Sequence, residues 1–464
     1  MYSEDTICAI SSPAGTGAIA LIRISGSKAI AVCNEAVSFH EKQLADISSN
    51  TVHLGRFIIN NEPVDEVMIS VFRSPHTYTG EDLVEISCHG SKYIQQKILE
   101  TIIEKGARLA KPGEFTQRAF LNGKMDLSQA EAVADLIASQ SAGAHRLAIN
   151  QMRGGFSDEI RSLRDKLLHF VSLMELELDF SEEDVEFANR KELEILISSI
   201  RALVERLISS FDYGNAMKHG IPVAIAGQTN SGKSTLLNLL LHEEKAIVSE
   251  IAGTTRDYIE DVIILKGIQF RFIDTAGLRH TTDNIESEGI RRTLKKIEQA
   301  RMVLVVIDLN ENPEEVEKGL SFIFDEKDKQ KEFIIVLNKK DIIAEDILKN
   351  RLKTYKNLWG KKAILQPISA KTGEGIDKLE DLLVSGLGNN PSGDLVVTNV
   401  RHLEALNHSS AALERAQNGL KNGIPGDLIS QDIREVLHYL GEITGEITND
   451  EILGNIFKNF CIGK

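Results

Sequence analysis

Over the first 120 residues, the spacing of apolar and polar residues indicates both strands and helices. Residues 19–24 and 83–88 are short apolar runs with the length of a strand, and residues 95–104 have the spacing of a helix. Arg23 and Glu85 stand inside the two strand-like runs. For either residue alone, the solvent-facing side of a pleat is a sufficient explanation. The pattern predicts a mixed α/β domain over residues 1–120.

A helical period follows over residues 121–216 and returns over residues 385–464. Ser128 and Glu131 have the spacing of a capping box near the start of the first block. The apolar stripes are formed by Leu193, Leu196, Ile197, Ile200, Val204, Leu207, Ile208 and Phe211, and later by Ile429, Ile433, Val436, Leu437 and Leu440. A helix with one apolar stripe must bury it. The two blocks therefore predict one helical bundle that is interrupted by an inserted domain.

The inserted segment, residues 217–384, alternates strand-like and helix-like stretches. The strand-like stretches are residues 223–226, 269–273, 302–309, 333–337 and 363–368. This alternation predicts a Ras-like, doubly wound sheet, and the loops at the carboxyl ends of its strands should carry the functional site. Residues 386–393, rich in glycine and asparagine, then form a short linker.

A phosphate-binding motif follows the first of these strands. Residues 227–235 read GQTNSGKST and are flanked by an apolar strand and an apolar helix. Backbone N–H groups of such a loop point at one spot, where the helix dipole also favours negative charge. Gly227 and Gly232 permit the turn, Lys233 would reach the β- and γ-phosphates, and the Ser234 hydroxyl would bind Mg²⁺. The alternative, a chance match in a glycine-rich turn, does not account for the flanking strand and helix.

Four further motifs follow, at the ends of strands or in the loops between them: GTTRD (253–257), DTAG (274–277), NKKD (338–341) and SAK (369–371). Asp274 would lie near the Mg²⁺, and Thr255 would close over it. A carboxylate at Asp341 can accept from N1–H and the 2-amino group of guanine, and adenine offers neither donor. The five motifs together predict a GTP-binding domain. Its expected contact residues are Ser231, Gly232, Lys233, Ser234, Thr235, Thr255, Asp274, Thr275, Ala276, Gly277, Asn338, Lys339, Asp341, Ser369, Ala370 and Lys371.

Composition narrows the class of protein. The chain has 464 residues, of which 42% are hydrophobic and 26% charged, as expected for a globular protein of several domains. A formal net charge of −15 argues against a protein that mainly coats nucleic acid, although a local basic patch remains open. Cys8, Cys33 and Cys88 are far apart, which favours free thiols. The acidic start of the chain and the lack of an apolar run of about 18 residues predict a cytoplasmic protein without a membrane span.

The order and spacing of the five motifs resemble those of translation-factor-like GTPases, and the whole chain resembles the MnmE (TrmE) family of tRNA-modifying GTPases. The segments that carry this resemblance are TGEDLVEISCHG, KPGEFTQRAFLNGKMDLSQAEAVADLI, EIAGTTRD, DTAGLR and the terminal FCIGK. The resemblance implies the wobble-uridine C5 modification of certain tRNAs, carboxymethylaminomethyl or aminomethyl, made with the FAD- and NADH-using partner MnmG in a heterotetramer. It also implies a folate-binding N-terminal domain that forms a homodimer, and a helical domain with an inserted G domain.

The resemblance also implies how GTP is hydrolysed. Ras-type enzymes orient water with a glutamine after the DxxG glycine, but Leu278 stands there and its side chain cannot polarise water. In the family a glutamate of the following segment has this role, alongside the loop lysine Lys233, and it corresponds to Glu286. The alternative is that Glu286 only suits the first turn of a helix. The family also binds K⁺, with two G domains facing each other, and the matching ligands are Asn230, Ser249, Ile251 and Thr254. Asn230, Ser249 and Thr254 also join the nucleotide-binding set.

The same resemblance implies a folate site. Arg23, Glu85 and Lys124 would hold 5-formyl- or methylene-tetrahydrofolate, and the C-terminal Lys464 would approach the same pocket. Cys461 in FCIGK is a candidate reactive thiol, although a single cysteine near a chain end is more often inert.

Two classes of function remain open. One is an enzyme component that couples GTP hydrolysis to one-carbon chemistry on tRNA. The other is a regulatory GTPase that binds RNA or the ribosome and performs no covalent chemistry. The second class usually carries an RNA-binding module after its G domain, such as a KH fold, whereas the residues after 385 have a helical pattern. In a third alternative the N-terminal domain only dimerises, which would remove the folate assignment alone.

Overall fold

The computed structural model describes residues 5–39, 43–179, 190–243, 261–273, 286–324, 331–386, 395–458 and 460–463. The chain divides into two compact units. The first comprises Met1–Ala134, Gln151–Arg201 and His408–Lys464, and the second comprises Asp135–Asn150 and Ala202–Asn407. The domain boundaries expected from sequence at residues 120, 216 and 384 remain predictions.

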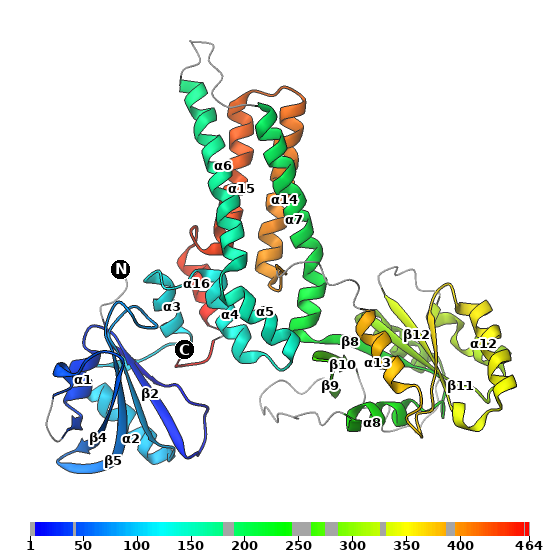
Figure 1. Cartoon of the computed structure of the whole chain (residues 1–464), viewed down its shortest axis with the longest axis horizontal. Coiled ribbons are helices and arrows are strands. Elements are labelled where there is room, and N and C mark those ends of the chain that lie inside the picture. The colour runs from blue at the N-terminus through cyan, green and yellow to red at the C-terminus, as the bar shows by residue number, and fades with distance from the viewer. Residues whose placement is uncertain are drawn as a thin grey trace. The chain divides into compact units, whose positions relative to one another are not determined.

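The first unit contains a seven-stranded sheet of order β3-β4-β5-β6-β2-β1-β7 (Figure 1). Its strands are β1 (Ile7–Ile10), β2 (Ile19–Ser25), β3 (Val37–Ser38), β4 (Thr51–Ile59), β5 (Glu62–Phe72), β6 (Leu83–His89) and β7 (Arg108–Leu109). Neighbouring strands are antiparallel except β1 and β7. Helices α1 (Ala29–Asn34) and α2 (Lys92–Glu104) pack on one face of the sheet over alternate strand residues. The two predicted strands and the predicted helix are confirmed, whereas the apolar pattern does not predict β1, β4 and β5.

Four long helices of the chain form an antiparallel bundle, which is built by both helical blocks. They are α6 (Gly155–Asp179), α7 (Arg190–His219), α14 (Val400–Lys421) and α15 (Gly426–Thr444). Arg201 Nη1 donates to Gln417 Oε1 at 2.9 Å and ties α7 to α14, and Arg164 Nε donates to Leu437 O at 3.3 Å and ties α6 to α15. Of the predicted stripes, Leu193, Ile197, Ile200, Ile429, Ile433 and Leu440 are buried. The prediction that the two blocks build one bundle is confirmed.

The helical blocks also contain the shorter helices α4 (Leu127–Ala138), α5 (Ala142–Met152) and α16 (Asp450–Phe457), and a further one, α3 (Glu114–Leu121), precedes them. The capping box predicted at Ser128 and Glu131 is wrong. Asp126 N donates to Gln129 Oε1 and Gln129 N donates to Asp126 Oδ1, both at 2.9 Å. Asp126 directly precedes α4, so its carboxylate reaches the unpaired N–H groups of the first turn, whereas Ser128 already lies inside the helix.

The second unit contains a six-stranded sheet of order β13-β12-β11-β8-β10-β9. Its strands are β8 (Ile221–Ala226), β9 (Asp261–Leu265), β10 (Ile268–Phe272), β11 (Met302–Asp308), β12 (Glu332–Asn338) and β13 (Ile364–Pro367). Its helices are α8 (Lys233–Glu243), α10 (Glu286–Gln299), α11 (Pro313–Leu320), α12 (Glu345–Trp359) and α13 (Ile376–Ser385). The five predicted strands are confirmed and pair in parallel. The antiparallel edge strand β9 is not predicted by the pattern.

Both faces of this parallel sheet are covered. Met302, Leu304 and Val306 of β11 pack into one hydrophobic cluster, and Val303 and Val305 pack into another on the opposite face. A strand that is buried on both sides has no room for a charged group along its length. Polar chemistry at β11 is therefore confined to the two ends of the strand.

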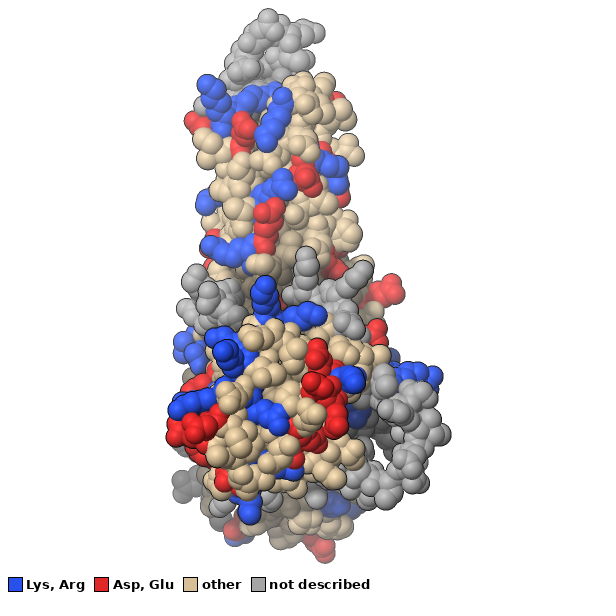
Figure 2. Space-filling model, turned by 90° about the vertical axis from the view of Figure 1, so that its right-hand side faces the viewer, with Lys and Arg blue, Asp and Glu red and all other residues tan. Residues whose placement is uncertain are grey.

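The surface carries charges of both signs. On the face that Figure 2 shows, Lys and Arg side chains are interspersed with Asp and Glu, without a continuous field of one sign. No helix in the described stretches of the chain is both long and apolar enough to cross a membrane.

Candidate functional site

The glycine-rich loop joins β8 to α8, as predicted. Gly227 and Gly232 have φ angles of 145° and 97°, and Asn230 also lies in the left-handed region with φ of 64°. A Cβ atom at Gly227 would overlap the carbonyl oxygen of Val306, and one at Gly232 would overlap Nδ2 of Asn338. Glycine is therefore needed at both positions, for the backbone conformation and for space. The loop lies directly against the ends of β11 and β12.

Lys233 begins α8, and its side chain folds back over the loop. Its Nζ donates to the carbonyl oxygens of Gly227 at 3.0 Å and Gln228 at 2.5 Å. Burial lowers the pKa of Lys233. Ser231 Oγ is buried and, among the residues that the structure describes, has no hydrogen-bond partner. A partly buried ammonium, an unsatisfied buried hydroxyl and a helix N-terminus at one place fit a phosphate group.

Asn338, at the end of β12, holds three segments together. Its Nδ2 donates to Ser231 O at 2.9 Å, and its Oδ1 accepts from Ala370 N at 2.9 Å. The buried Asn338 side-chain amide thus joins the phosphate loop, the NKKD motif and the SAK motif through its donor and its acceptor. These three motifs, widely separated in sequence, meet at the carboxyl end of the sheet. Asn338 acts here as a positioning residue.

Asp341 is the exposed carboxylate of this corner. Its Oδ1 accepts from Ser369 Oγ at 2.6 Å, and that hydrogen bond lowers the pKa of Asp341. Lys339 has φ of 67°, and its Nζ donates to Asp308 Oδ2 at 2.5 Å. Burial alone would raise the pKa of Asp308, but the Lys339 bond brings it below its usual value. Sequence reasoning missed Asp308; the available signal was a carboxylate at the end of a buried strand.

The other predicted nucleotide-site residues differ in whether the structure describes them. Ser234, Thr235 and Lys371 are exposed. Glu286 is the first residue of α10. Outside the described residues lie Ser249, Ile251, Thr254, Thr255, Asp274, Thr275, Ala276, Gly277 and Leu278. Within the described ranges, no group of three or more His, Cys, Asp or Glu side chains is arranged to hold a metal ion.

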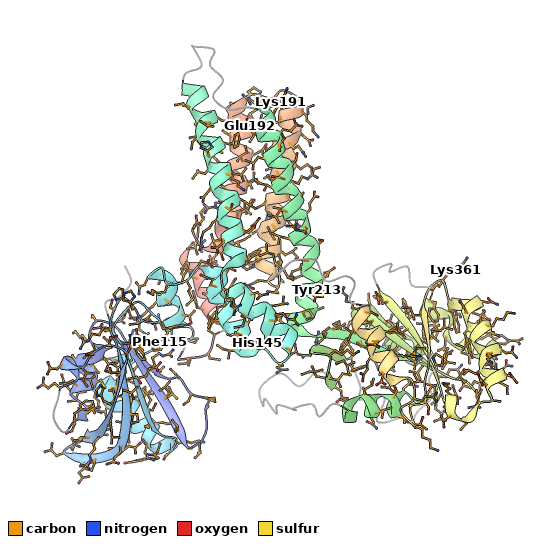
Figure 3. All side chains as sticks on the ribbon, viewed as in Figure 1. Phe115, His145, Lys191, Glu192, Tyr213 and Lys361 are labelled. Atoms are coloured by element: carbon orange, nitrogen blue, oxygen red, sulfur yellow. The ribbon has the colours of Figure 1, made fainter. Side chains whose placement is uncertain are left out.

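Arg23 and Glu85 form an ion pair on the face of the N-terminal sheet that α1 and α2 leave open. They are opposite each other in the β2–β6 ladder, with Arg23 Nη2 at 2.6 Å from Glu85 Oε1. The Arg23 guanidinium also lies 5.5 Å and 5.7 Å from the ring centroids of Tyr78 and Phe115. Figure 3 labels Phe115 in the N-terminal part of the chain. The two charged side chains are 17% and 20% exposed. A simple solvent-facing position is therefore wrong for both side chains, and the Tyr78 and Phe115 rings lie beside the Arg23 guanidinium.

Lys124 and the C-terminal segment approach the same domain. Lys124 Nζ donates to Pro75 O at 2.7 Å, three residues before Tyr78. After α16 the chain returns to the N-terminal sheet, where Ser11 Oγ donates to Gly463 O at 3.0 Å. Cys461 is an exposed free thiol. Lys464 lies outside the described residues.

An ion network that sequence reasoning missed supports this domain. Arg118 Nη2 donates to Asp5 Oδ1 at 2.8 Å and to Glu114 Oε1 at 3.1 Å, and Arg108 Nη1 donates to Glu114 Oε2 at 2.8 Å. Burial alone would raise the pKa of Glu114, yet the bond from Arg108 holds it below its usual value. The available signal was the spacing of four residues between Glu114 and Arg118, which places them on one face of α3.

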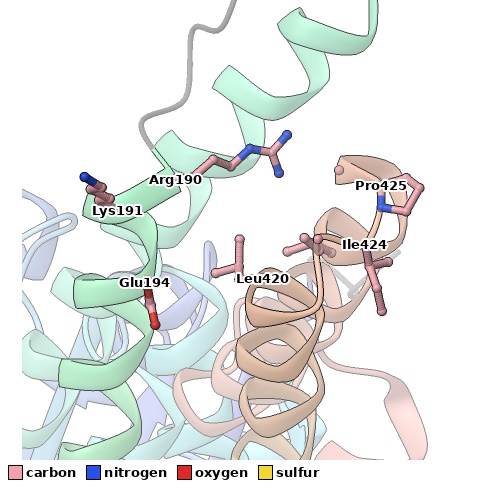
Figure 4. A pocket seen from close by; sticks show the side chains of 9 residues that line it. Arg190, Lys191, Glu194, Leu420, Ile424 and Pro425 are labelled. Carbon is pink, nitrogen blue, oxygen red and sulfur yellow. The ribbon is translucent and has the colours of Figure 1, made fainter.

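The bundle also contains a cavity of about 340 Å³, between the first turn of α7 and the connection from α14 to α15 (Figure 4). Leu420 and Ile424 provide apolar lining, and Arg190, Lys191 and Glu194 provide charged lining. It holds none of the predicted site residues.

A doubly wound sheet whose strand ends bring together a phosphate loop, an NKKD corner and a SAK corner defines a P-loop GTPase domain. Two family models match the chain: the MnmE helical domain over residues 127–461, and the GTP-binding protein TrmE N-terminus over residues 6–124. The chain belongs to the MnmE family of tRNA modification GTPases.

Individual relatives agree with this. The chain is 52% identical to the tRNA modification GTPase MnmE of Bacteroides thetaiotaomicron and 50% identical to that of Flavobacterium johnsoniae, in each case over 100% of both chains. The crystal structure of the G domain of the T. maritima FeoB iron transporter is 27% identical and covers 36% of this chain and 99% of that chain. Its TM-score is 0.27, which is too low to carry an argument.

Proposed function

We propose that this protein is the GTP-hydrolysing component of tRNA wobble-uridine C5 modification, which adds carboxymethylaminomethyl or aminomethyl together with a MnmG-type FAD protein. The observation that carries the proposal is the meeting of three nucleotide motifs around Asn338, in a chain that matches MnmE relatives over its whole length. FAD enters only through the partner, in a heterotetramer. The reaction would take place in the cytoplasm. The helices α14, α15 and α16 that follow the G domain support this class over a regulatory RNA-binding switch.

The nucleotide would be held at the carboxyl end of the second sheet. The loop N–H groups and Lys233 would bind the phosphates, and Asp341 would accept from the guanine base. Ser234, Thr255 and Asp274 would hold Mg²⁺, and Asn230, Ser249, Ile251 and Thr254 would hold K⁺. When bound, the two cations neutralise charge that develops on the phosphates. Of these proposed cation ligands, the structure describes Ser234 and Asn230. Asn230 lies in the phosphate loop, and its φ angle is in the left-handed region.

Glu286 would orient the attacking water, in the place of the missing glutamine. We expect Glu286→Ala to bind GTP with unchanged affinity and to lose turnover by about 100-fold or more, the usual contribution of a group that positions or deprotonates water. Glu298→Ala, later on the same helix, is the matched control and should keep full turnover. Replacing K⁺ by Na⁺ should also abolish the stimulated rate. Unchanged turnover in either case would remove the corresponding role.

Coupling to the tRNA reaction would come from the G domains of a homodimer. If the two domains close on each other only around the triphosphate, the segments near Thr255 and Glu286 would order and the helical arms would move. Labels on the two G domains should therefore show a shorter distance with a transition-state mimic than with GDP. Equal distances in the two states would rule out this coupling.

The N-terminal domain would bind 5-formyl- or methylene-tetrahydrofolate. The covered Arg23–Glu85 pair and the approach of the C-terminal segment to Ser11 support this site. Arg23→Met should weaken binding of 5-formyl-tetrahydrofolate by about tenfold or more in calorimetry, because a charge-assisted contact is lost. Arg56→Met, at an exposed position of β4 in the same sheet, is the control. Equal loss in both variants would leave dimerisation as the role of this domain.

Analysis of tRNA nucleosides tests the proposal as a whole. Cells that lack this chain should lose the modified wobble uridines and regain them with the wild-type protein. A strain with Cys461→Ser should lack them although its GTPase rate is normal, if the exposed thiol takes part in the reaction. Normal nucleosides in the deletion strain would contradict the proposed function, and normal nucleosides with Cys461→Ser would contradict the thiol alone.

A further inference from the structure

The connection from β11 to α11 lies against the phosphate loop. Gly227 begins that loop, and a Cβ atom there would meet the carbonyl oxygen of Val306 near the end of β11. On α11, Glu315 O accepts from Gln228 Nε2 at 3.4 Å, and the absence of a side chain at Gly319 leaves room for the same Gln228 amide. The phosphate loop therefore has neighbours on this connection besides the NKKD and SAK motifs.

Hydrogen bonds fix the path of this connection. Asp308, the last residue of β11, accepts with Oδ1 from Asn310 N at 2.9 Å and from Asn310 Nδ2 at 3.0 Å. The Asp308 carbonyl oxygen accepts from Glu311 N at 3.1 Å. Asn312 then caps α11, and its Oδ1 accepts from Glu314 N at 3.3 Å. Glu311 thus stands in a short turn that is held at both ends.

The Glu311 carboxylate is partly buried in this turn. Its Oε2 is buried and has no hydrogen-bond partner within the part of the chain that the structure describes. The charged and titratable groups that face it are Lys233, Asp308, Glu315, Lys339 and Tyr355. Asp308 and Lys339 form an ion pair with each other, so their charges largely cancel. Burial, and after it the Asp308 carboxylate, raises the pKa of Glu311. Lys233 is therefore the cation of the phosphate loop that the Glu311 charge faces.

Lys233 does not need Glu311 for its orientation. Its Nζ already donates to the carbonyl oxygens of Gly227 and Gln228, and neither bond involves Glu311. Bound GDP or GTP would bring phosphate charge to the same ammonium. A carboxylate and a phosphate that share one lysine repel each other, and this repulsion is stronger in a partly buried site than in water. The Glu311 charge therefore opposes nucleotide binding.

We propose that Glu311 weakens the binding of nucleotide phosphates and thereby speeds the release of GDP after hydrolysis. Its role is electrostatic, and it lies outside the five sequence motifs of the nucleotide site. The inference rests on that nucleotide site and does not depend on the tRNA chemistry. Protonation of Glu311 removes the repulsion, so the effect is complete above its raised pKa and is lost as the pH falls through that value.

The test measures the binding and release of GDP by the full-length protein with Mg²⁺. Excess GDP displaces a fluorescent GDP derivative to give the release rate, and calorimetry with GDP gives the affinity. The variant is Glu311→Gln, which removes the charge and keeps the size of the side chain. One control is Glu317→Gln, which removes the same charge from an exposed position of α11. The other is Glu311→Asp, which keeps the charge.

We expect Glu311→Gln to bind GDP about tenfold more tightly than wild type and to release it about tenfold more slowly. Glu317→Gln should remain within about twofold of wild type, and Glu311→Asp should lie closer to wild type than Glu311→Gln does. The ratio of the GDP affinities of Glu311→Gln and wild type should fall toward one between about pH 8 and about pH 5. A purely structural role of Glu311 would not produce this pH dependence.

Equal GDP affinity and release in Glu311→Gln and wild type, or an equal change in Glu317→Gln, overturns the proposal. A ratio that stays constant with pH overturns it as well. If Glu311→Gln does not fold, Glu311→Met, an uncharged side chain of similar length, takes its place with the same expected result. Wild-type protein that does not bind GDP would contradict the nucleotide site itself, and this proposal with it.

Discussion

The two sheets of this protein place their charged residues in different positions. In the parallel sheet of the second unit, each residue of β11 is buried. The predicted nucleotide-binding groups of this sheet lie at the strand ends and in the loops that follow them. In the antiparallel N-terminal sheet, β2 alternates between buried and partly exposed positions, and Arg23 lies in the middle of the strand. A parallel sheet is covered on both faces and leaves only its ends for polar chemistry, whereas an antiparallel sheet can use a face. The site architecture follows from this difference.

The difference also decides what a sequence can reveal. At the end of a parallel strand the functional residues share one short loop, so they form a contiguous motif such as NKKD. On the face of an antiparallel sheet the partners come from different strands, and Arg23 meets Glu85 across 62 residues of chain. Substitutions in the two sheets should therefore have different consequences: loss of nucleotide choice at the strand ends of the G domain, and loss of stability on the N-terminal face.

The largest effect is expected at the end of the parallel sheet. Asp341→Asn should weaken GDP binding by about 1,000-fold, because the amide cannot accept both guanine hydrogens. The same variant should gain affinity for a xanthine nucleotide, whose 2-oxo group accepts from the new amide. Calorimetry with both nucleotides measures the change, and Asp346→Asn on exposed α12 is the control. A variant that keeps the affinity of wild type for GDP would show that Asp341 does not contact the base.

The next largest effect is expected on the stability of the first unit. Glu114→Gln should lower the free energy of unfolding by about 3 kcal/mol, because it leaves Arg108 and Arg118 beside an uncharged partner. The folded-state pKa of Glu114 is lowered, so its contribution is complete above the ordinary pKa of glutamate and is lost as the pH falls through the lowered value. Urea unfolding at several pH values measures this. Glu100→Gln, in an exposed pair on α2, should leave the curve unchanged, and equal curves for the two variants would contradict a structural role for the network.

A smaller effect is expected for the Arg23–Glu85 pair. In a double-mutant cycle with Arg23→Met and Glu85→Gln, the coupling free energy should be about 1 kcal/mol, and the double variant should be more stable than the sum of the single losses predicts. This follows because each single substitution leaves one covered charge without its partner. Additive losses in urea unfolding would mean that the pair is effectively solvated, which would remove the contrast between the two sheets.

The smallest effect is expected in chemical labelling of the cysteine thiols. Burial raises the pKa of Cys8 and Cys33 to about 12 and that of Cys88 to about 11, so at pH 8 these buried groups are almost entirely protonated. Iodoacetamide should label only the exposed Cys461 in the native protein and all four cysteines in urea. Mass spectrometry of the peptides reads this directly. Rapid native labelling of Cys88 would show that the face of the N-terminal sheet opens in solution.

Much of the fold could be predicted from the sequence, because apolar periodicity survives wherever an element has one buried face. The five parallel strands and the interrupted bundle follow from this pattern. The edge strand β9 was missed although its apolar residues follow one another as in β10, and β4 and β5 were missed because polar residues interrupt their apolar runs. The capping residue Asp126 was missed because the Ser128 and Glu131 spacing offered an equally good box.

The candidate sites divide in the same way. The phosphate loop and Asp341 are readable because one loop contains all their chemistry. Of the Arg118 network only the Glu114–Arg118 spacing is readable, since Asp5 and Arg108 come from other segments that only the tertiary fold brings together. The folate residues could be named only through the family resemblance.

Calorimetry of the wild-type protein with GDP and with ADP, each with Mg²⁺, tests the central claim most directly. If the three corners joined by Asn338 form a guanine nucleotide site, GDP should bind at least about 100-fold more tightly than ADP. Equal affinities for the two nucleotides would contradict the account.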